Sequence, residues 1–412
     1  MSLADDAKLL LIPTGYKTSK VYSVFPTDGD GDFTYTRSGD ASRVNPGGLI
    51  ETVGTNIPRI DHFGGGCPTL NLEPQRTNLQ VYSEDFNNSA WAKSNSTIDS
   101  NSIIAPTGEM TADKVIANTA TGNHYVQDVA SGLSTSSKAT LSVFVKKDEV
   151  TQIELLAAQN GSPYTNWCRL RFDLNTLSTF QTPIGDYKYE DFGNGWLRLS
   201  ITGTPTSSWE NIRFTLYKNN TSNWTGNNVD GFYLFGAQVE QGSYPTSYIK
   251  TEASTVTRLK DDLQDLNNVD LINSVEGVFY AEIRAFKSET VFRFITLNDG
   301  TSSNTVRIYL YNRIYARLLV GGVEQCIFNT THYDVTEFNK IAFLYSPNNF
   351  KLFVNGVLIG TDTSGSTFTN GTLTTLSFDR GDNAFRFDGA VKDLRVYDTA
   401  LTDAELIELT TL

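Results

Sequence analysis

Pro68-Thr-Leu-Asn-Leu-Glu-Pro74-Gln-Arg-Thr-Asn-Leu-Gln-Val-Tyr-Ser-Glu-Asp-Phe86 marks the change from one part of the chain to the next. Leu70 and Leu72 alternate with polar residues, which is the two-residue period of a strand with one buried face. Pro68 and Pro74 bound this strand because proline has no N–H group to donate within a sheet. A polar loop follows before the sequence becomes apolar again. The stretch therefore predicts a strand and a loop between two folded regions.

The composition of the 412 residues is typical of short strands joined by tight turns. Charged residues make up only 19% of the chain, whereas aromatic residues reach 12%. The 33 basic and 46 acidic residues give a net charge of −13, and an acidic surface repels a phosphate backbone. We therefore expect an all-β protein that does not bind nucleic acid.

The cysteines and histidines do not have the spacing of a metal site or of a local disulfide framework. They are Cys67, Cys168, Cys326, His62, His124 and His332. A zinc site is therefore not expected. The apolar run at residues 9–13 is too short for a signal-peptide core or a membrane span. We expect neither membrane insertion nor export by a classical signal.

The loop Asp28–Asp32 places carboxylates at alternate positions, as calcium loops do. An EF-hand loop needs glycine at its sixth position and glutamate at its twelfth, where Phe33 and Gly39 stand. We therefore interpret the loop as a hydrated turn. No cofactor is expected, although calcium stays open, because three further aspartates lie near predicted strand ends: Asp379, Asp382 and Asp388.

Residues 91–250 contain strands whose aliphatic residues all lie on one face. The alternation is clear at residues 139–146, 168–174, 197–201 and 212–216. Strands with a single aliphatic face are what two packed antiparallel sheets require. The middle of the chain is therefore predicted to be a β-sandwich.

Residues 251–275 are predicted to be a polar linker, and residues 276–412 a second sandwich. Two apolar runs, 350–354 and 357–360, flank Asn355-Gly356, a strong hairpin signal. At the end of the chain, Thr402 and Glu405 have the spacing of a helix capping box. The short helix that follows is expected to dock through two leucines, Leu406 and Leu409.

Several motifs resemble bacteriophage virion fibre proteins of the tail-fibre and head-fibre kind. They are Leu-Glu-Pro-Gln-Arg-Thr-Asn-Leu (72–79), Tyr-Ser-Glu-Asp-Phe (82–86), Arg-Val-Asn-Pro-Gly-Gly-Leu-Ile-Glu (43–51) and Asn-Ile-Pro-Arg-Ile-Asp (56–61). Residues 231–249 resemble the closing strand of a carbohydrate-binding-like jelly roll. Residues 350–360 and 388–406 resemble the concanavalin A-like, laminin-G-type lectin fold.

The resemblance implies tandem antiparallel β-sandwiches after a small β-rich N-terminal region. It divides the chain into an N-terminal virion-attachment region (1–90), a carbohydrate-binding-like jelly roll (91–250), a linker (251–275) and a concanavalin A-like sandwich (276–412). It also implies a phage virion surface or fibre protein, a homotrimer that contacts other virion proteins. Its implied function is adhesion to a host cell-surface glycan.

Polar and aromatic residues occupy the face opposite the aliphatic one in the middle region. An indole or phenol ring can stack on a sugar, while guanidinium and carboxylate groups bond its hydroxyls. If the strands share one sheet, the glycan site comprises Trp167, Arg169, Arg171, Trp196, Arg198, Arg213, Tyr217 and Glu154. The same alternation recurs at residues 306–317, which carry Arg307 and Tyr309. Because such residues are also favoured at subunit interfaces, that interpretation stays open.

No catalytic motif accompanies these residues. The sequence lacks a Gly-x-Ser-x-Gly elbow and a P-loop, so we expect no enzyme. For a glycosidase, Glu154 and Glu240 are the two carboxylates that we would pair. Two other interpretations stay open: a purely structural decoration or adaptor protein of a phage head or tail, and a glycan depolymerase.

Overall fold

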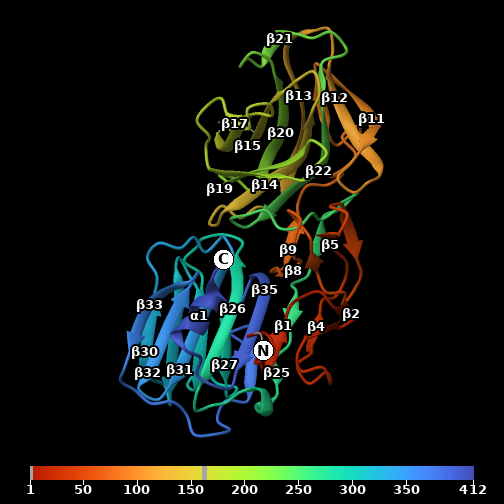
Figure 1. Cartoon of the computed structure of the whole chain (residues 1–412). Coiled ribbons are helices and arrows are strands. Elements are labelled where there is room, and N and C mark those ends of the chain that lie inside the picture. Colours follow the sequence, from red (N-terminus) through yellow and green to blue (C-terminus); the bar gives the residue numbers. More distant parts are fainter. Residues whose placement is uncertain (1–2, 160–164) are drawn as a thin grey trace.

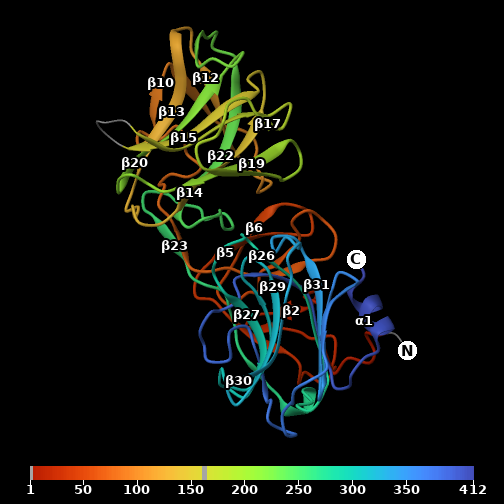
Figure 2. The same ribbon diagram turned by 90° about the vertical axis from the view of Figure 1, so that its left-hand side faces the viewer.

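The computed structural model describes residues 3–159 and 165–412. Two β-sandwiches lie one above the other, and the N-terminal segment runs beside the C-terminal one (Figure 1). The same arrangement is visible after a quarter turn (Figure 2). The expected all-β class with tandem antiparallel sandwiches is confirmed. In the described residues, no helix is long and apolar enough to cross a membrane.

The middle sandwich packs two antiparallel sheets around the aliphatic faces that the sequence predicts. Its seven-stranded sheet has the order β10-β13-β20-β15-β16-β17, with β21 paired to β13. These strands are β10 (Ala92–Ser94), β13 (Thr121–Ser131), β15 (Gln152–Gln159), β16 (Asn166–Asp173), β17 (Ser178–Thr179), β20 (Trp209–Tyr217) and β21 (Asn223–Thr225). Its six-stranded sheet has the order β11-β12-β22-β14-β19-β18. These strands are β11 (Ser96–Ile104), β12 (Met110–Ala117), β14 (Ala139–Lys147), β18 (Asp186–Asp191), β19 (Trp196–Gly203) and β22 (Gly231–Gln241).

The C-terminal sandwich consists of an eight-stranded and a six-stranded antiparallel sheet. The larger has the order β33-β32-β31-β26-β35-β8-β7, with β1 also paired to β35. Its strands are β1 (Leu9–Leu11), β7 (Ile60–Asp61), β8 (Thr69–Leu72), β26 (Gly277–Ala285), β31 (Asn339–Ser346), β32 (Asn349–Val354), β33 (Val357–Asp362) and β35 (Gly389–Tyr397). The smaller has the order β25-β34-β27-β28-β29-β30. Its strands are β25 (Leu266–Asn267), β27 (Arg293–Asn298), β28 (Thr305–Leu310), β29 (Ile314–Val320), β30 (Val323–Asn329) and β34 (Thr375–Ser377).

Three strands from the first 72 residues belong to the eight-stranded sheet. β1 pairs with β35 at Leu9–Leu11, and β8 pairs with the same strand near Gly389. The expectation of a separate N-terminal region at residues 1–90 is wrong in this respect. The physical reason is that β35 pairs with β26 on one side only and would otherwise present an open edge.

Residues 251–275 also differ from the polar linker that was expected. β23 (Val256–Arg258) pairs with β9 (Arg76–Asn78), and β24 (Asp262–Leu263) pairs with β4 (Phe33–Thr36). The remaining elements are β2 (Tyr16–Lys17), β3 (Lys20–Val21), β5 (Ala41–Val44), β6 (Ile50–Val53) and the 3-10 helix η1 (Val269–Leu271). The segment is therefore tied to the N-terminal residues along most of its length.

The helix α1 (Asp403–Thr410) covers the outer face of the eight-stranded sheet. The expected capping box is present, because Thr402 accepts from the Glu405 amide and Glu405 accepts from the Thr402 amide. Leu406 and Leu409 are buried, as predicted, among residues of that sheet and of the N-terminal segment. The helix therefore lies on one outer face of the C-terminal sandwich, and the opposite outer face belongs to the six-stranded sheet.

Candidate functional site

Two of the tryptophans expected to stack on sugar are buried. Trp167 is 5% exposed and lies in the core of the middle sandwich. Trp196 is 2% exposed, and its indole N–H donates to the Ile104 carbonyl at 3.1 Å. Neither ring presents a face to solvent, so their expected role in stacking is wrong.

The eight expected site residues also do not share one sheet. β16 and β20 belong to the seven-stranded sheet of the middle sandwich, whereas β19 belongs to the six-stranded one. Arg198, on β19, donates to the Thr246 carbonyl at 2.7 Å and to the Ser142 hydroxyl at 3.1 Å, both buried. Arg198 therefore belongs to the packing between the middle sandwich and the residues that follow it.

Four of the expected residues do come together: Glu154 and, around it, Arg171, Arg213 and Tyr217. Its carboxylate accepts from Arg171 at 2.6 Å and from the Tyr217 hydroxyl at 3.3 Å, and Arg213 lies 3.7 Å away. The Arg171 guanidinium lies 4.9 Å from the centre of the Tyr217 ring, over its face. Burial, followed by the Glu154 charge, raises the pKa of Tyr217. This Glu154 cluster is a packed polar layer in which the tyrosine ring is covered by a cation.

Arg169 lies beside the Glu154 cluster on the same strand as Arg171. The two arginines occupy alternate positions of β16, opposite Leu156 and Glu154 of β15. Glu240, in contrast, lies on β22 of the other sheet and is fully buried. Glu154 and Glu240 therefore belong to different layers of the sandwich, and the structure does not bring them together as a glycosidase pair.

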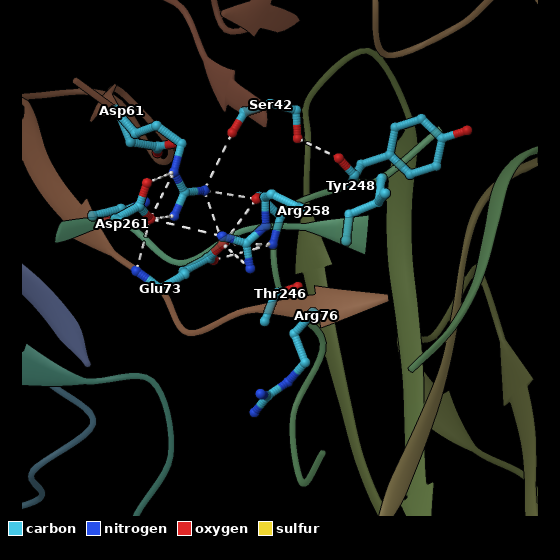
Figure 3. Close-up of polar contacts among 12 residues, drawn as sticks. Ser42, Asp61, Glu73, Arg76, Thr246, Tyr248, Arg258 and Asp261 are labelled. Atoms are coloured by element: carbon cyan, nitrogen blue, oxygen red, sulfur yellow. Dashed lines mark hydrogen bonds and ion pairs between the residues drawn. The ribbon is translucent and has the colours of Figure 1, made fainter. Parts of the chain in front are cut away.

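A buried ionic network joins the N-terminal segment to the residues after the middle sandwich (Figure 3). Asp261 accepts from Arg59 Nε at 3.1 Å, from Arg37 at 3.3 Å and from the Glu73 amide at 2.8 Å. Glu73 lies 2.8 Å from Arg59 and 3.3 Å from Arg258. Burial works to raise the pKa of Asp261, but Arg59 and Arg258 outweigh it and lower that pKa to about 2.

The stretch 68–86 places several residues of this junction. Glu73 accepts from the Ser247 amide at 3.1 Å, which links the end of β8 to the chain just after β22. Asn78 donates to the carbonyls of Ala237 at 3.2 Å and Ile249 at 2.8 Å. This network was missed at the sequence level, because its members are separated by up to 224 positions and carry no local spacing signal.

A row of aromatic rings crosses the outer face of the six-stranded sheet of the C-terminal sandwich. Phe294, Tyr309 and Tyr315 stand opposite one another on β27, β28 and β29. The Tyr309 and Tyr315 rings are stacked with centres 4.8 Å apart and planes 5° apart, and Phe294 lies 4.7 Å from Tyr309. We call the set the aromatic row; its members are Phe385, Phe292, Phe294, Tyr309, Tyr311 and Tyr315.

One end of the aromatic row is open to solvent. Phe292 is 37% exposed and Phe385 is 46% exposed. Phe292 stacks on Tyr311 at 4.5 Å between ring centres and lies 5.7 Å from both Phe294 and Phe385.

The tyrosines of the aromatic row follow from the alternation noted in the sequence. The phenylalanines were missed, although the spacing of Phe292 and Phe294 by two positions was the signal that could have found them.

Three arginines surround the aromatic row. Arg307 lies over the Phe294 ring with its guanidinium carbon 5.6 Å from the ring centre, and Arg380 lies over Phe385 at 4.8 Å. Arg317 stands opposite Arg307 on the neighbouring strand. The face thus combines flat apolar surface with guanidinium groups, which are the two elements of sugar recognition.

No group of three or more histidine, cysteine, aspartate or glutamate side chains could hold a metal ion within the part of the chain that the structure describes. Asp32 accepts from the Ser23 amide at 2.9 Å and lies 3.3 Å from Lys20. Asp382 pairs with Arg380 at 2.6 Å. Both carboxylates are thus already engaged by basic side chains of the protein.

Comparisons with known proteins agree with the C-terminal fold. Residues 280–407 match the family model described as the concanavalin A-like lectin/glucanases superfamily. No curated protein matches the sequence.

Several solved structures are similar to parts of the chain. The CBM40 module of an IT-sialidase from Ruminococcus gnavus, bound to alpha2,3 sialyllactose, is 21% identical, covers 33% of this chain and 83% of its own, and has a TM-score of 0.29. A heptameric SAP-like pentraxin from Limulus polyphemus is 15% identical (33% and 70% covered, TM-score 0.26). Domains LG4-5 of the mouse laminin alpha1 chain are 11% identical (69% and 89% covered, TM-score 0.24). The region that matches the family model, residues 280–407, folds as part of an antiparallel β-sandwich.

Proposed function

We propose that the protein binds glycan, without covalent chemistry, through the outer face of the six-stranded sheet of the C-terminal sandwich. The observation that carries this proposal is the aromatic row, whose open end offers exposed rings beside guanidinium groups. A pyranose can lay its apolar face on Phe292 while its hydroxyls accept from a nearby arginine. The match of residues 280–407 to a lectin-type family model supports the assignment.

The Glu154 cluster is proposed as a second contact surface. Arg169, Arg171 and Arg213 supply donors there, and Glu154 holds two of them in fixed positions. Because the Tyr217 ring is covered by Arg171, this surface would bind through hydrogen bonds rather than by stacking.

The site of action proposed for this binding is the surface of a phage virion, where the protein would attach to host glycan as a homotrimer beside other virion proteins. The motifs at residues 43–51, 56–61 and 72–86 support this part of the proposal through their resemblance to fibre proteins. Light scattering on the purified protein tests the oligomer, with a trimer mass expected. Labelled antibody on intact virions tests the location.

Truncating Phe292 to alanine is expected to weaken glycan binding by about 1–2 kcal/mol, because the change removes stacking area that is exposed in the free protein. The measurement is a glycan-array screen followed by calorimetric titration of the strongest binder. Recovery of intact glycan at the end separates binding from depolymerisation.

Tyr187→Ala is the matched control for Phe292→Ala. Tyr187 is a similarly exposed ring, but it lies on β18 of the middle sandwich. Its truncation should leave glycan affinity unchanged. Equal affinity losses in the two variants, or none in Phe292→Ala, would remove the aromatic row from the binding surface.

A further inference from the structure

Arg307 is held rigidly at the centre of the proposed site. It is 5% exposed, and its Nε donates to the Thr305 hydroxyl at 2.7 Å while Nη2 donates to the Ser302 carbonyl. In the described residues no hydrogen bond engages its Nη1 atom. The side chain stands on the outer face of the sheet beside Tyr309 and over Phe294. A fixed guanidinium with one nitrogen uncommitted is therefore built into the aromatic row.

The charge environment separates Arg307 from the other buried arginines. Within the described residues these are Arg37, Arg59, Arg198, Arg258, Arg293 and Arg307. Four of them form ion pairs with a carboxylate: Arg37, Arg59, Arg258 and Arg293. Burial raises the pKa of Glu240, and the charge of the nearby Arg198 opposes that rise without cancelling it. Arg307 forms no ion pair in the described part of the chain.

Two neighbouring cations have the largest effect among the charges that act on Arg307. Burial, followed by Arg317 and Arg380, lowers the pKa of Arg307 to about 10. Those two arginines have carboxylate partners of their own, Glu324 at 2.7 Å and Asp382 at 2.6 Å. A buried cation that forms no ion pair of its own, beside two other cations, is costly for the free protein. An anion bound at this face would remove that cost.

We infer that the glycan bound at the aromatic row is an acidic saccharide, whose carboxylate or sulfate oxyanion pairs with Arg307 while a sugar ring stacks on Phe292. This inference rests on the proposed glycan binding and specifies its ligand class. Either oxyanion can accept a charge-assisted hydrogen bond from the uncommitted Nη1 atom of Arg307.

The test uses the full chain on an array of carboxylated, sulfated and neutral oligosaccharides. The carboxylated members are printed a second time after chemical reduction of the carboxyl groups to alcohols. We expect binding to acidic members at least tenfold stronger than to neutral ones. If the carboxylate is the anion, its reduction abolishes binding; if a sulfate is the anion, the sulfated members bind and reduction changes nothing.

Arg307→Gln is the decisive variant, with Arg313→Gln as its control, because Arg313 is an exposed arginine between β28 and β29. We expect Arg307→Gln to lose at least tenfold in affinity for the acidic probe, Arg307→Lys to recover part of it, and Arg313→Gln to lose nothing. Thermal unfolding of Arg307→Gln should show no loss of stability, since the change removes a buried charge that forms no ion pair.

The outcomes separate the inference from the proposed function. Equal binding of neutral, reduced and acidic glycans, or unchanged affinity in a folded Arg307→Gln protein, overturns the acidic ligand but leaves glycan binding intact. Absence of binding to every member of the array overturns the proposed function, and the inference falls with it. A fall in affinity that accompanies a large fall in melting temperature, in both Arg307→Gln and Arg307→Lys, shows that Arg307 is structural and also overturns the inference.

Discussion

Replacing Asp261 with asparagine is expected to lower the free energy of unfolding by about 3–5 kcal/mol, the usual cost of removing one partner from a buried ionic pair. Asp261 faces Arg37, Arg59 and Arg258 and is fully desolvated. Among the described residues, Glu73 is the one other carboxylate that forms ion pairs with these arginines, and it reaches Arg59 and Arg258 but not Arg37. Urea unfolding followed by tryptophan fluorescence measures the change.

Asp270→Asn is the control for this substitution. Asp270 is exposed on the 3-10 helix η1, so the same chemical change there should alter stability by less than about 0.5 kcal/mol. Equal stability of the two variants would mean that the buried network does not hold the N-terminal segment to the chain after the middle sandwich.

The same network gives stability a defined dependence on pH. Because the pKa of Asp261 is lowered to about 2 in the folded protein, its contribution is complete above the unfolded value of about 4 and is lost as the pH falls toward 2. Asp388 acts in the opposite sense, since burial raises its pKa to about 6. Its protonation favours the folded form as the pH falls from 6 to 4. Asp261→Asn should therefore flatten the loss of stability below pH 4.

Local patterns in the sequence were sufficient for the fold class. Period-two alternation identifies strands because burial of one face acts on each strand separately. The Asn355-Gly356 hairpin and the Thr402–Glu405 cap depend only on neighbouring residues, and both form as expected. The division into two sandwiches follows from the same signals.

Pairing between distant strands could not be predicted in this way. β1 and β8 bind along β35 more than 300 positions away, and backbone hydrogen bonds carry no side-chain signature of their partner. The candidate site failed for the same reason, because alternation shows which residues share a face of one strand but not which strands share a sheet. β16 and β19 have equivalent patterns and lie in different sheets.

The two tryptophans are buried for different reasons, one through a local irregularity of its strand and the other through a contact with distant residues. On β16 a register shift opposite Ala157 and Ala158 displaces Trp167 from the face that carries Arg169 and Arg171. Trp196 stays on the outer face of its sheet, but it is buried there among Ile50, Phe144 and other residues of a second apolar cluster. Neither the bulge nor the covering segment can be read from residues near the tryptophan.

Truncating Trp167 or Trp196 to alanine is accordingly expected to lower the free energy of unfolding by about 3–5 kcal/mol, the range for a large ring removed from a packed core. Trp209 provides the matched control, because it is 60% exposed at the start of β20. Trp209→Ala should change stability by less than about 0.5 kcal/mol. Denaturant midpoints of the three variants, measured beside glycan affinity, separate packing from recognition. A Trp167→Ala protein that kept its midpoint and lost only glycan binding would return that ring to the binding surface and contradict its place in the core.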